Sequence, residues 1–332
     1  MNKLQMISIY QKLAVAAAIT AFSLTLIKAN SAQAIQIIPS GYQVEEISTG
    51  SFELVQASGL ALDTNNNIYV ARNFFNGSSD LLKITPSGNV SSIASFNTFI
   101  GGLAINKSQQ VFGALFDGSV FQLQDENVSY FATGLPSTLE KLAFDQNNNL
   151  FVASFSAGTV SKITPEGSVT TFVSGLSGPF GVAFKGESLF IGDNLNGGVQ
   201  PGIIREVTPL GSVTTFLSPI PGRIVDLEYE LTSDSFFVAN QGVFVNGVQL
   251  PGTIDLINNG QITTFATGFL GGSDVFPREL EFDSKGNLYV TDAQKLYKIS
   301  KSKLTTIPEP TSVFAVLIFG FLGAGSVLKK KM

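Results

Sequence analysis

The chain has 332 residues, a formal net charge of −5 and 28 phenylalanines, but no histidine, cysteine or tryptophan. Without histidine or cysteine it cannot form a Ser-His-Asp or Cys-His catalytic group, a disulfide, or a metal site built on either residue type. Any chemistry must use carboxylates, amides, hydroxyls, lysine, tyrosine or a cation held by oxygen. The charge gives no basic footprint, so we expect no nucleic-acid partner.

The first 34 residues have the organisation of a secretory signal peptide. Lys3 and Lys12 precede an apolar run at residues 13–27, and the triplet Ala32, Gln33, Ala34 is a small-x-small cleavage site. A transmembrane anchor is the alternative, but the run is shorter than the roughly 20 residues that such a helix needs. We therefore expect residues 1–34 to direct export and to be removed.

A unit of four short strands recurs through the middle of the chain. In its clearest copy the strands lie at residues 142–144, 150–153, 160–164 and 168–172, separated by turns rich in Asn, Gly and Pro. Alternating apolar residues between such turns are typical of antiparallel hairpins.

The first strand of this unit is found six times, and its copies begin 39 to 53 residues apart by subtraction of their first positions. They begin at Gly59, Gly102, Lys141, Gly181, Asp226 and Glu279. A period of about 40 residues with four strands per repeat indicates a β-propeller blade. We therefore predict an all-β fold, a six-bladed β-propeller of four-stranded antiparallel blades, over residues 35–307.

Two segments compete to complete the last blade. Residues 42–50 precede the first repeat and resemble an isolated fourth strand, and residues 303–307 follow the last repeat. Either one would tie the two ends of the ring together and remove an exposed sheet edge. The sequence alone does not choose between them.

The C-terminal segment has three parts. Pro308, Glu309 and Pro310 are followed by residues 311–328, which carry no charge, and then by three lysines at 329–331. Eighteen helical residues span roughly 27 Å, about the hydrocarbon thickness of a bilayer, and the lysines favour the cytoplasmic side. We expect a transmembrane helix that tethers an exported domain.

The order of these parts in residues 308–332 resembles the PEP-CTERM sorting signal. The resemblance implies recognition by an exosortase-type sorting enzyme, removal of the tail, and delivery to the cell surface or extracellular matrix of a bacterium. A plain tail anchor that happens to contain Pro-Glu-Pro is the alternative.

Residues 145–153 and 283–292 resemble the six-bladed propellers of the NHL, SMP-30/gluconolactonase and strictosidine-synthase-like group. Residues 277–283, together with the sorting signal, are similar to the ScyD/ScyE propellers of cyanobacterial scytonemin clusters. Propellers host many functions, so the resemblance specifies the fold better than an activity. The gluconolactonase type implies a divalent metal held by Glu, Asn and Asp, whereas a catalytic histidine of related lyases and esterases has no counterpart here.

Acidic residues replace glycine and alanine in the first strands of blades five and six. The set consists of Asp226, Glu228, Glu279 and Glu281. Alternate positions of a strand share a face, so we expect one cluster near the central channel. It can hold Ca²⁺ or Mg²⁺, or supply an acid/base pair with Glu228 and Glu281 as catalytic candidates. A structural network with Arg223 and Arg278 is the alternative interpretation.

A second set of oxygen-bearing residues lies where the second strand of a repeat ends. It consists of Asn73, Asp193, Asn194, Asn240 and Asp292. These positions are expected at one mouth of the ring, where they suit a cation or a sugar; turn chemistry is the alternative. Matched insertions at residues 196–203 and 246–253 are candidates for lid hairpins over that mouth.

These features favour an exported binding or scaffold module over an enzyme, although the sequence leaves the enzymatic question open. The expected partner is a polysaccharide, a matrix protein or a small metabolite. One alternative is a metal-dependent hydrolase or lactonase of the SMP-30 type. The other is an accessory role in extracellular pigment biosynthesis of the scytonemin kind, which the resemblance implies.

Overall fold

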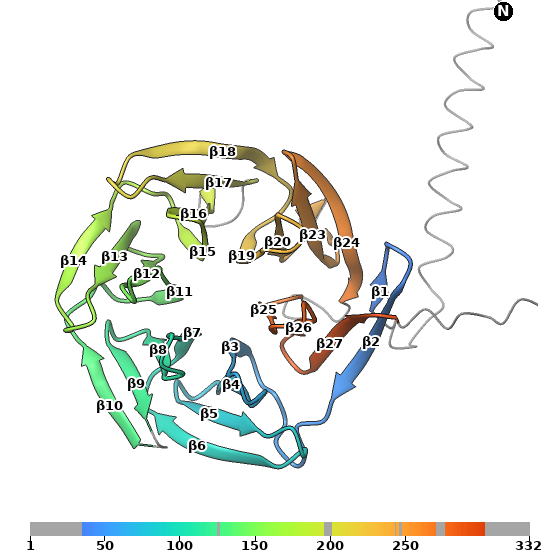
Figure 1. Cartoon of the computed structure of the whole chain (residues 1–332), viewed down its shortest axis with the longest axis horizontal. Helices are drawn as coiled ribbons and strands as arrows, with labels where there is room; N and C mark the ends of the chain where they lie inside the picture. The colour runs from blue at the N-terminus through green and yellow to red at the C-terminus, as the bar shows by residue number, and fades with distance from the viewer. Residues whose placement is uncertain are drawn as a thin grey trace, which may run out of the picture.

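The computed structural model describes residues 35–124, 127–195, 201–242, 244–245, 248–269 and 276–302. Within them, six antiparallel sheets of four or five strands surround a central channel (Figure 1). The predicted six-bladed propeller is therefore confirmed. The expected signal peptide, the Pro-Glu-Pro motif, the apolar segment 311–328 and residues 303–307 lie outside the described residues.

Each of the first four blades is built from four consecutive strands. Blade one contains β3 (Ala57–Leu62), β4 (Ile68–Asn73), β5 (Ser79–Ile84) and β6 (Val90–Phe96). Blade two contains β7 (Ile100–Ile105), β8 (Val111–Leu115), β9 (Val120–Gln124) and β10 (Asn127–Ala132). Blade three contains β11 (Leu139–Phe144), β12 (Leu150–Ser154), β13 (Thr159–Ile163) and β14 (Val169–Val173). Blade four contains β15 (Pro179–Lys185), β16 (Ser188–Asp193), β17 (Gly202–Val207) and β18 (Val213–Ile220).

The last two blades also use strands from the beginning of the chain. Blade five contains β19 (Ile224–Glu230), β20 (Ser235–Asn240), β23 (Gly252–Asn258) and β24 (Gln261–Phe269), with β1 (Gln36–Ile37) added at its edge. Blade six contains β25 (Glu279–Phe282), β26 (Leu288–Thr291), β27 (Leu296–Lys301) and β2 (Tyr42–Ile47). The short strands β21 (Phe244–Val245) and β22 (Val248–Gln249) pair with each other at the beginning of the second insertion, whereas most of the first insertion, residues 196–200, lies outside the described residues.

The ring is closed by an N-terminal strand. β2 pairs antiparallel with β27, in a register that runs from Tyr42 opposite Lys301 to Ile47 opposite Leu296. The segment that begins at Tyr42 thus supplies the fourth strand of blade six, as one of the two sequence hypotheses proposed. Closure joins the two ends of the ring and covers the open edge of β27.

The runs of three asparagines at residues 65–67 and 147–149 form hairpin turns. Asp145 Oδ1 accepts hydrogen bonds from the backbone nitrogens of Asn147 at 2.8 Å and Asn149 at 2.9 Å, and Asn148 has a φ of 59°. Asp63 and Asp283 make the same contacts in their own turns. A carboxylate that satisfies the turn's own backbone explains these residues without a bound ion.

The core lies between neighbouring blades, where phenylalanine rings pack edge to face. Phe112 contacts Phe131 of its own blade at 4.9 Å and Phe144 of the next blade at 5.1 Å between ring centroids. Phe151 repeats this arrangement with Phe172 and Phe184. Phenylalanine side chains packed in this way bury large apolar areas, and this burial holds each blade against the next.

The six innermost strands, β3, β7, β11, β15, β19 and β25, lie around the channel (Figure 1). Glycines allow them to approach closely near the mouth. A Cβ atom on Gly101 would lie 2.0 Å from the carbonyl oxygen of Leu139, and one on Gly181 would lie 2.7 Å from the nitrogen of Leu227. The channel is therefore narrow where these strands begin.

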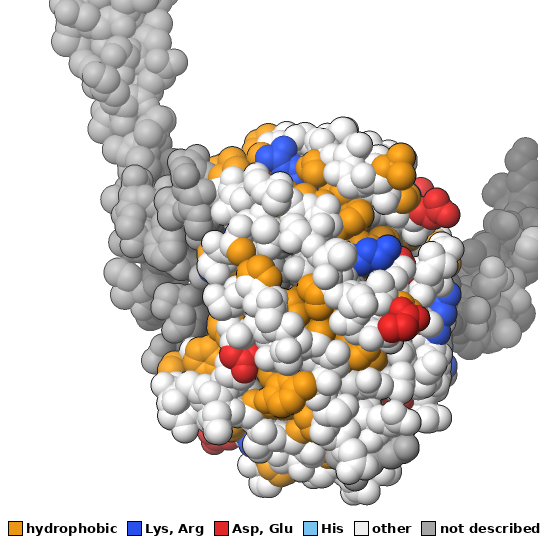
Figure 2. Space-filling model, turned by 90° about the vertical axis from the view of Figure 1, so that its left-hand side faces the viewer, with side chains coloured by type: hydrophobic (Ala, Val, Ile, Leu, Met, Phe, Trp, Pro, Cys, Tyr) orange, Lys and Arg blue, Asp and Glu red, His pale blue; other side chains and the backbone are white. Residues whose placement is uncertain are grey.

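The side of the ring seen in Figure 2 carries few charged side chains, and hydrophobic side chains are scattered over it among backbone and uncharged polar groups. Scattered exposed apolar residues are normal for a propeller of this size. No helix long and apolar enough to cross a bilayer is present in the described part of the chain.

Candidate functional site

A cavity of about 350 Å³ opens at the mouth where the innermost strands begin. All six blades contribute residues to its lining. The aromatic side chains are Phe99, Phe116, Phe180 and Phe276, and the charged ones are Glu140, Lys141, Arg223, Arg278 and Glu279. A concave site with apolar walls and a few convergent charged groups is the arrangement expected of a small-ligand pocket.

An ion pair between opposite blades crosses the channel below this mouth. Lys141 of β11 in blade three pairs with Glu279 of β25 in blade six, and both side chains are buried. The Lys141 ammonium also donates to the carbonyl oxygens of Ser58 at 2.9 Å and Gly101 at 3.0 Å. One lysine therefore contacts blades one, two and six from its place in blade three.

This pairing refines the alternative interpretation of the acidic cluster, in which Arg223 and Arg278 were candidate partners. Glu279 forms its ion pair with Lys141, although Arg278 also lowers the pKa of Glu279. Burial has the larger effect and raises that pKa well above its ordinary value. Arg223 instead faces Glu140.

Asp226 joins the inner strands of blades five and six. Its Oδ1 atom accepts a hydrogen bond from the backbone nitrogen of Leu227 at 2.9 Å, and Oδ2 accepts one from Leu280 at 2.8 Å. Burial raises the pKa of Asp226, whereas Lys141 and these two backbone donors lower it. The expected proximity of the acidic positions on β19 and β25 is thus present, but backbone groups occupy this carboxylate.

Glu228 and Glu281 are the remaining members of the acidic set. Burial raises the pKa of Glu281 to about 8, and the negative charge of Asp226 adds to the effect. Burial and the charges of Glu281 and Asp226 raise the pKa of Glu228 well above its ordinary value. Both residues are half-buried, and no cation of the described residues offsets the shift.

The donor set does not favour a Ca²⁺ or Mg²⁺ site in this arrangement. Calcium takes six to eight oxygen ligands, but Asp226 is used by backbone nitrogens and Glu279 by Lys141. Among the described residues, no group of three or more acidic side chains is placed to hold a metal ion. A metal on Asp226, Glu228, Glu279 and Glu281 stays a prediction.

Glu140 is a second carboxyl group of the mouth, beside Glu279, whose pKa is raised. Burial raises its pKa to about 8, although Lys141, Arg223 and Arg278 all act to lower it. The Arg223 guanidinium lies 4.9 Å from the ring centroid of Phe180, and that of Arg278 lies 4.8 Å from Phe276. The mouth thus combines cations held over aromatic rings with a carboxyl group that titrates near neutral pH.

Two of the predicted mouth asparagines join neighbouring blades. Asn73 accepts a hydrogen bond from the backbone nitrogen of Ile100 at 3.0 Å and donates to its carbonyl oxygen at 3.0 Å. Asn194 makes the same pair of contacts with Ile224, each at 2.8 Å. Both side chains are buried, and of the two only Asn73 lines the mouth cavity.

The other three predicted mouth residues stabilise their own blades. Asp193 accepts hydrogen bonds from the backbone nitrogens of Ser177 and Gly178, and it pairs with Arg205 at 3.2 Å. Asn240 donates to Asp255 at 2.5 Å. Asp292 accepts from the backbone nitrogens of Gln294 and Lys295. These contacts give all five residues structural roles, and ligand binding by any of them stays a prediction.

Sequence reasoning missed Glu140, Lys141 and the four phenylalanines of the mouth. One signal was available, because Lys141 stands where three other copies of the first strand carry glycine. The phenylalanines gave no comparable signal. Phe99, Phe180 and Phe276 lie at or just before the beginning of an inner strand, where no repeat pattern marks them.

No protein-family model matches the sequence, and no curated protein is similar to it. Solved structures share the fold. A gluconolactonase from Xanthomonas campestris is 12% identical with a TM-score of 0.63, over 82% of this chain and 95% of that one. Virginiamycin B lyase from Staphylococcus aureus is 14% identical with a TM-score of 0.57, over 78% and 99%. At such identities the likeness shows a common fold and not a common activity.

Proposed function

We propose that the chain is a binding propeller whose mouth takes a small ligand with an apolar body and a negatively charged group. The observation that carries the proposal is the cavity in which Arg223 and Arg278 lie over phenylalanine rings. Lys141 and Glu279 pair with each other, and the pKa of Glu140 is about 8. At neutral pH the two guanidinium groups therefore give the mouth a positive charge, which favours an anion.

The aromatic side chains select for the ligand's body. Phe99 and Phe116 pack edge to face at 5.6 Å, and Phe180 and Phe276 line the cavity as well. Desolvation of an aromatic or aliphatic group against these rings contributes roughly 25 cal/mol per Å² of buried apolar area. An aryl or alkyl carboxylate has both required parts.

The dimensions favour a small metabolite over a polysaccharide or a matrix protein as the partner at this mouth. The cavity of about 350 Å³ lies at the low end of the usual range for small-ligand pockets. The ion pair of Lys141 and Glu279 crosses the channel, so a polymer cannot be threaded through the ring at this level.

The place of action forms part of the proposal. Residues 1–34 would direct export, and residues 308–332 would present the propeller to an exosortase-type enzyme for sorting to the cell surface or extracellular matrix. The apolar segment 311–328 would hold the chain in the membrane before that processing. There the mouth would meet small molecules outside the cell, including intermediates of an extracellular pigment.

A lactonase or other hydrolase is the second candidate, and Glu140 is the observation that favours it. A carboxyl group with a pKa of about 8 can act as a general acid or base near neutral pH. The neighbouring guanidinium groups can stabilise an oxyanion. Such a reaction would use Glu140 in place of Glu228 and Glu281, the candidates of the sequence hypothesis.

Paired ligands that differ only in charge test the binding proposal. Phenylacetate and its neutral amide, phenylacetamide, are titrated into the purified chain by ligand-observed NMR. We expect the carboxylate to bind at least about tenfold more tightly, since a charge-assisted hydrogen bond contributes about 1.5–3 kcal/mol. Arg223→Ala should remove the difference in affinity between the two ligands. Lys185→Ala is the control, because Lys185 lies at the end of β15 away from the mouth, and it should leave that difference unchanged. Equal affinity for the two ligands would refute the proposal.

A further inference from the structure

Blade one lacks an aromatic pair that four other blades possess. In these blades, a phenylalanine of the second strand contacts a phenylalanine of the fourth strand. The pairs are Phe112 with Phe131, Phe151 with Phe172, Phe190 with Phe216, and Phe237 with Phe265. Tyr69 and Ile93 occupy the same two positions in blade one. The seam between blades one and two is therefore filled by smaller or more polar side chains.

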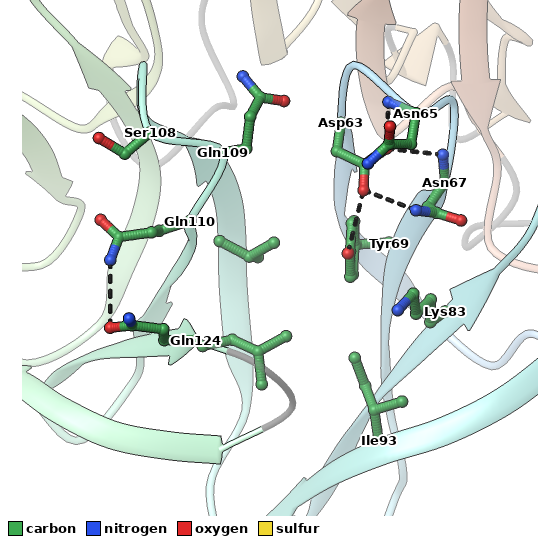
Figure 3. A pocket seen from close by; sticks show the side chains of 12 residues that line it. Asp63, Asn65, Asn67, Tyr69, Lys83, Ile93, Ser108, Gln109, Gln110 and Gln124 are labelled. Carbon is green, nitrogen blue, oxygen red and sulfur yellow. Dashed lines mark hydrogen bonds between the residues drawn. The ribbon is translucent and has the colours of Figure 1, made fainter.

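A cavity of about 440 Å³ opens at this seam, on the side of the hairpin turns and away from the mouth (Figure 3). Its apolar lining consists of Ile93, which is half-buried, and of Val111 and Leu123, which are almost fully buried. The volume falls within the range of small-ligand pockets.

Two polar groups face each other across the cavity (Figure 3). On the side of blade one, Asp63 accepts hydrogen bonds from Asn67 at 2.7 Å and from the Tyr69 hydroxyl at 3.3 Å. On the side of blade two, Gln110 donates to Gln124 at 3.3 Å. The structure thus orients carboxamide groups on both walls, and a hydroxyl group on the wall of blade one, before any ligand arrives.

A further glutamine fixes the two walls relative to each other. Gln109 Oε1 accepts a hydrogen bond from the backbone nitrogen of Thr64 at 2.7 Å, which joins the hairpin turns of the two blades. Gln110 is itself held, because Asn106 donates to its Oε1 atom at 2.7 Å. Side chains that are already positioned lose less conformational entropy when they bind a ligand.

The lining is electrically balanced and rich in groups that both donate and accept. It contains one acidic and one basic side chain, Asp63 and Lys83, and five carboxamides, those of Asn65, Asn67, Gln109, Gln110 and Gln124. The side-chain amide nitrogens of Asn65 and Gln124 donate no hydrogen bond to another described residue. An apolar ligand would leave these groups unpaired, and a charged one would meet no net countercharge.

We propose that the seam between blades one and two binds a neutral saccharide. Sugar hydroxyls both donate and accept hydrogen bonds, which matches carboxamides on two facing walls, and the C–H face of the ring matches Ile93. The opening between blades five and six, of about 380 Å³, is instead lined by Phe237, Phe265 and Phe282. The proposed saccharide site therefore differs in its lining from that opening and is separate from the mouth.

The test uses the full chain and a panel of neutral sugars: glucose, galactose, mannose, N-acetylglucosamine and cellobiose. Saturation-transfer NMR followed by titration measures the affinity for each. Ile93→Phe restores the phenylalanine found in four other blades and should fill the cavity while the fold is kept. The double variant with Gln110→Ala and Gln124→Ala removes polar contacts without filling it. We expect both to weaken binding of the best sugar at least about tenfold.

Two matched controls locate the effect. Lys285→Ala alters the opening between blades five and six, and Arg223→Ala alters the mouth; neither should change sugar affinity. Melting curves of all variants exclude loss of the fold as the cause. The proposal is overturned if no sugar of the panel binds at up to about 10 mM, or if binding survives both seam variants.

Discussion

Lys141 and Glu279 form a buried ion pair between opposite blades, although 138 positions separate them in the sequence. The lysine is held by two further carbonyl oxygens, and the glutamate stands beside Asp226 in the narrow part of the channel. A pair of this kind can form only when the ring is closed, because only closure places blade three opposite blade six. It also separates the mouth cavity from the carboxyl groups deeper in the channel.

Removal of the lysine should destabilise the propeller strongly. Lys141→Met leaves Glu279 buried without its partner, and loss of one member of a buried ion pair typically costs about 3–5 kcal/mol. The double variant with Glu279→Leu removes both charges and should recover most of that loss. Urea denaturation of the three proteins measures the free energy of unfolding. A double variant as unstable as the single one would show that the pair is not an energetic unit.

The buried carboxyl group of Glu281 should make the fold less stable as the pH rises. The pKa of Glu281 is about 8 in the folded chain, above the ordinary value of 4.5, so folding favours the protonated form. Its contribution is fully present below about pH 4.5 and is lost as the pH rises through about 8. We therefore expect the melting temperature to fall between about pH 5 and pH 9, apart from ordinary acid effects at lower pH.

Glu281→Gln tests the origin of that pH dependence. The amide has nearly the same shape and no charge, so this variant should lose part of the decline in melting temperature at high pH. Glu187→Gln, in an exposed hairpin turn, is the matched control and should follow the unaltered chain. If the melting temperatures of both variants fall with pH as steeply as that of the parent, titratable groups other than Glu281 cause the pH dependence.

The fold could be predicted because each blade repeats the same local pattern. Hairpin turns such as Asp145 to Asn149, and in most blades the aromatic positions of the second and fourth strands, recur about every 40 residues, as four-stranded blades require. The proximity of Asp226 and Glu279 followed from the same logic, since sequential blades are neighbours and alternate residues of a strand share a face.

The mouth could not be predicted from the sequence, because its residues meet only across the ring. Lys141 lies 138 positions before Glu279, its partner in blade six, and Phe180 and Phe276 stand outside the periodic strand positions. Asparagine and aspartate at strand ends suggested ligand binding, but Asn194 and Asp193 use their side chains to satisfy nearby backbone groups. Local composition does not distinguish these two uses.

Asn73 and Asn194 provide a direct way to separate structural from ligand-binding roles. Each holds the backbone nitrogen and carbonyl of an isoleucine in the next blade. Alanine at either position leaves buried backbone groups unpaired, so each variant should lose about 1–3 kcal/mol of stability. Only Asn73 lines the mouth cavity.

The two variants are compared in thermal unfolding and in phenylacetate binding. If Asn73 serves only the fold, both variants lose similar stability and keep the affinity of the parent. A selective loss of affinity in Asn73→Ala would assign it the ligand contact that the sequence hypothesis gave it. If neither variant loses stability, the two asparagine side chains do not contribute to the packing of neighbouring blades.

Glu140 should make anion binding at the mouth depend on pH. Its carboxyl group, with a pKa of about 8, is protonated at neutral pH and becomes negative as the pH rises through that value. A carboxylate ligand stays ionised over this range, so its affinity should fall several-fold between about pH 7 and pH 9 because like charges then face each other. Titrations of phenylacetate across this range measure the effect, and Glu140→Gln should abolish it.

The same variant distinguishes binding from catalysis. Glutamine cannot transfer a proton, so Glu140→Gln would remove hydrolysis of a δ-lactone such as gluconolactone if Glu140 is the general acid or base. Binding of phenylacetate at neutral pH should be nearly unchanged, because the parent carboxyl group is neutral there as well. Lactone hydrolysis by the parent that is lost only in this variant would favour the hydrolase. With no hydrolysis by the parent and a pH-dependent affinity that Glu140→Gln flattens, the mouth is a binding site in which Glu140 tunes the affinity for anions.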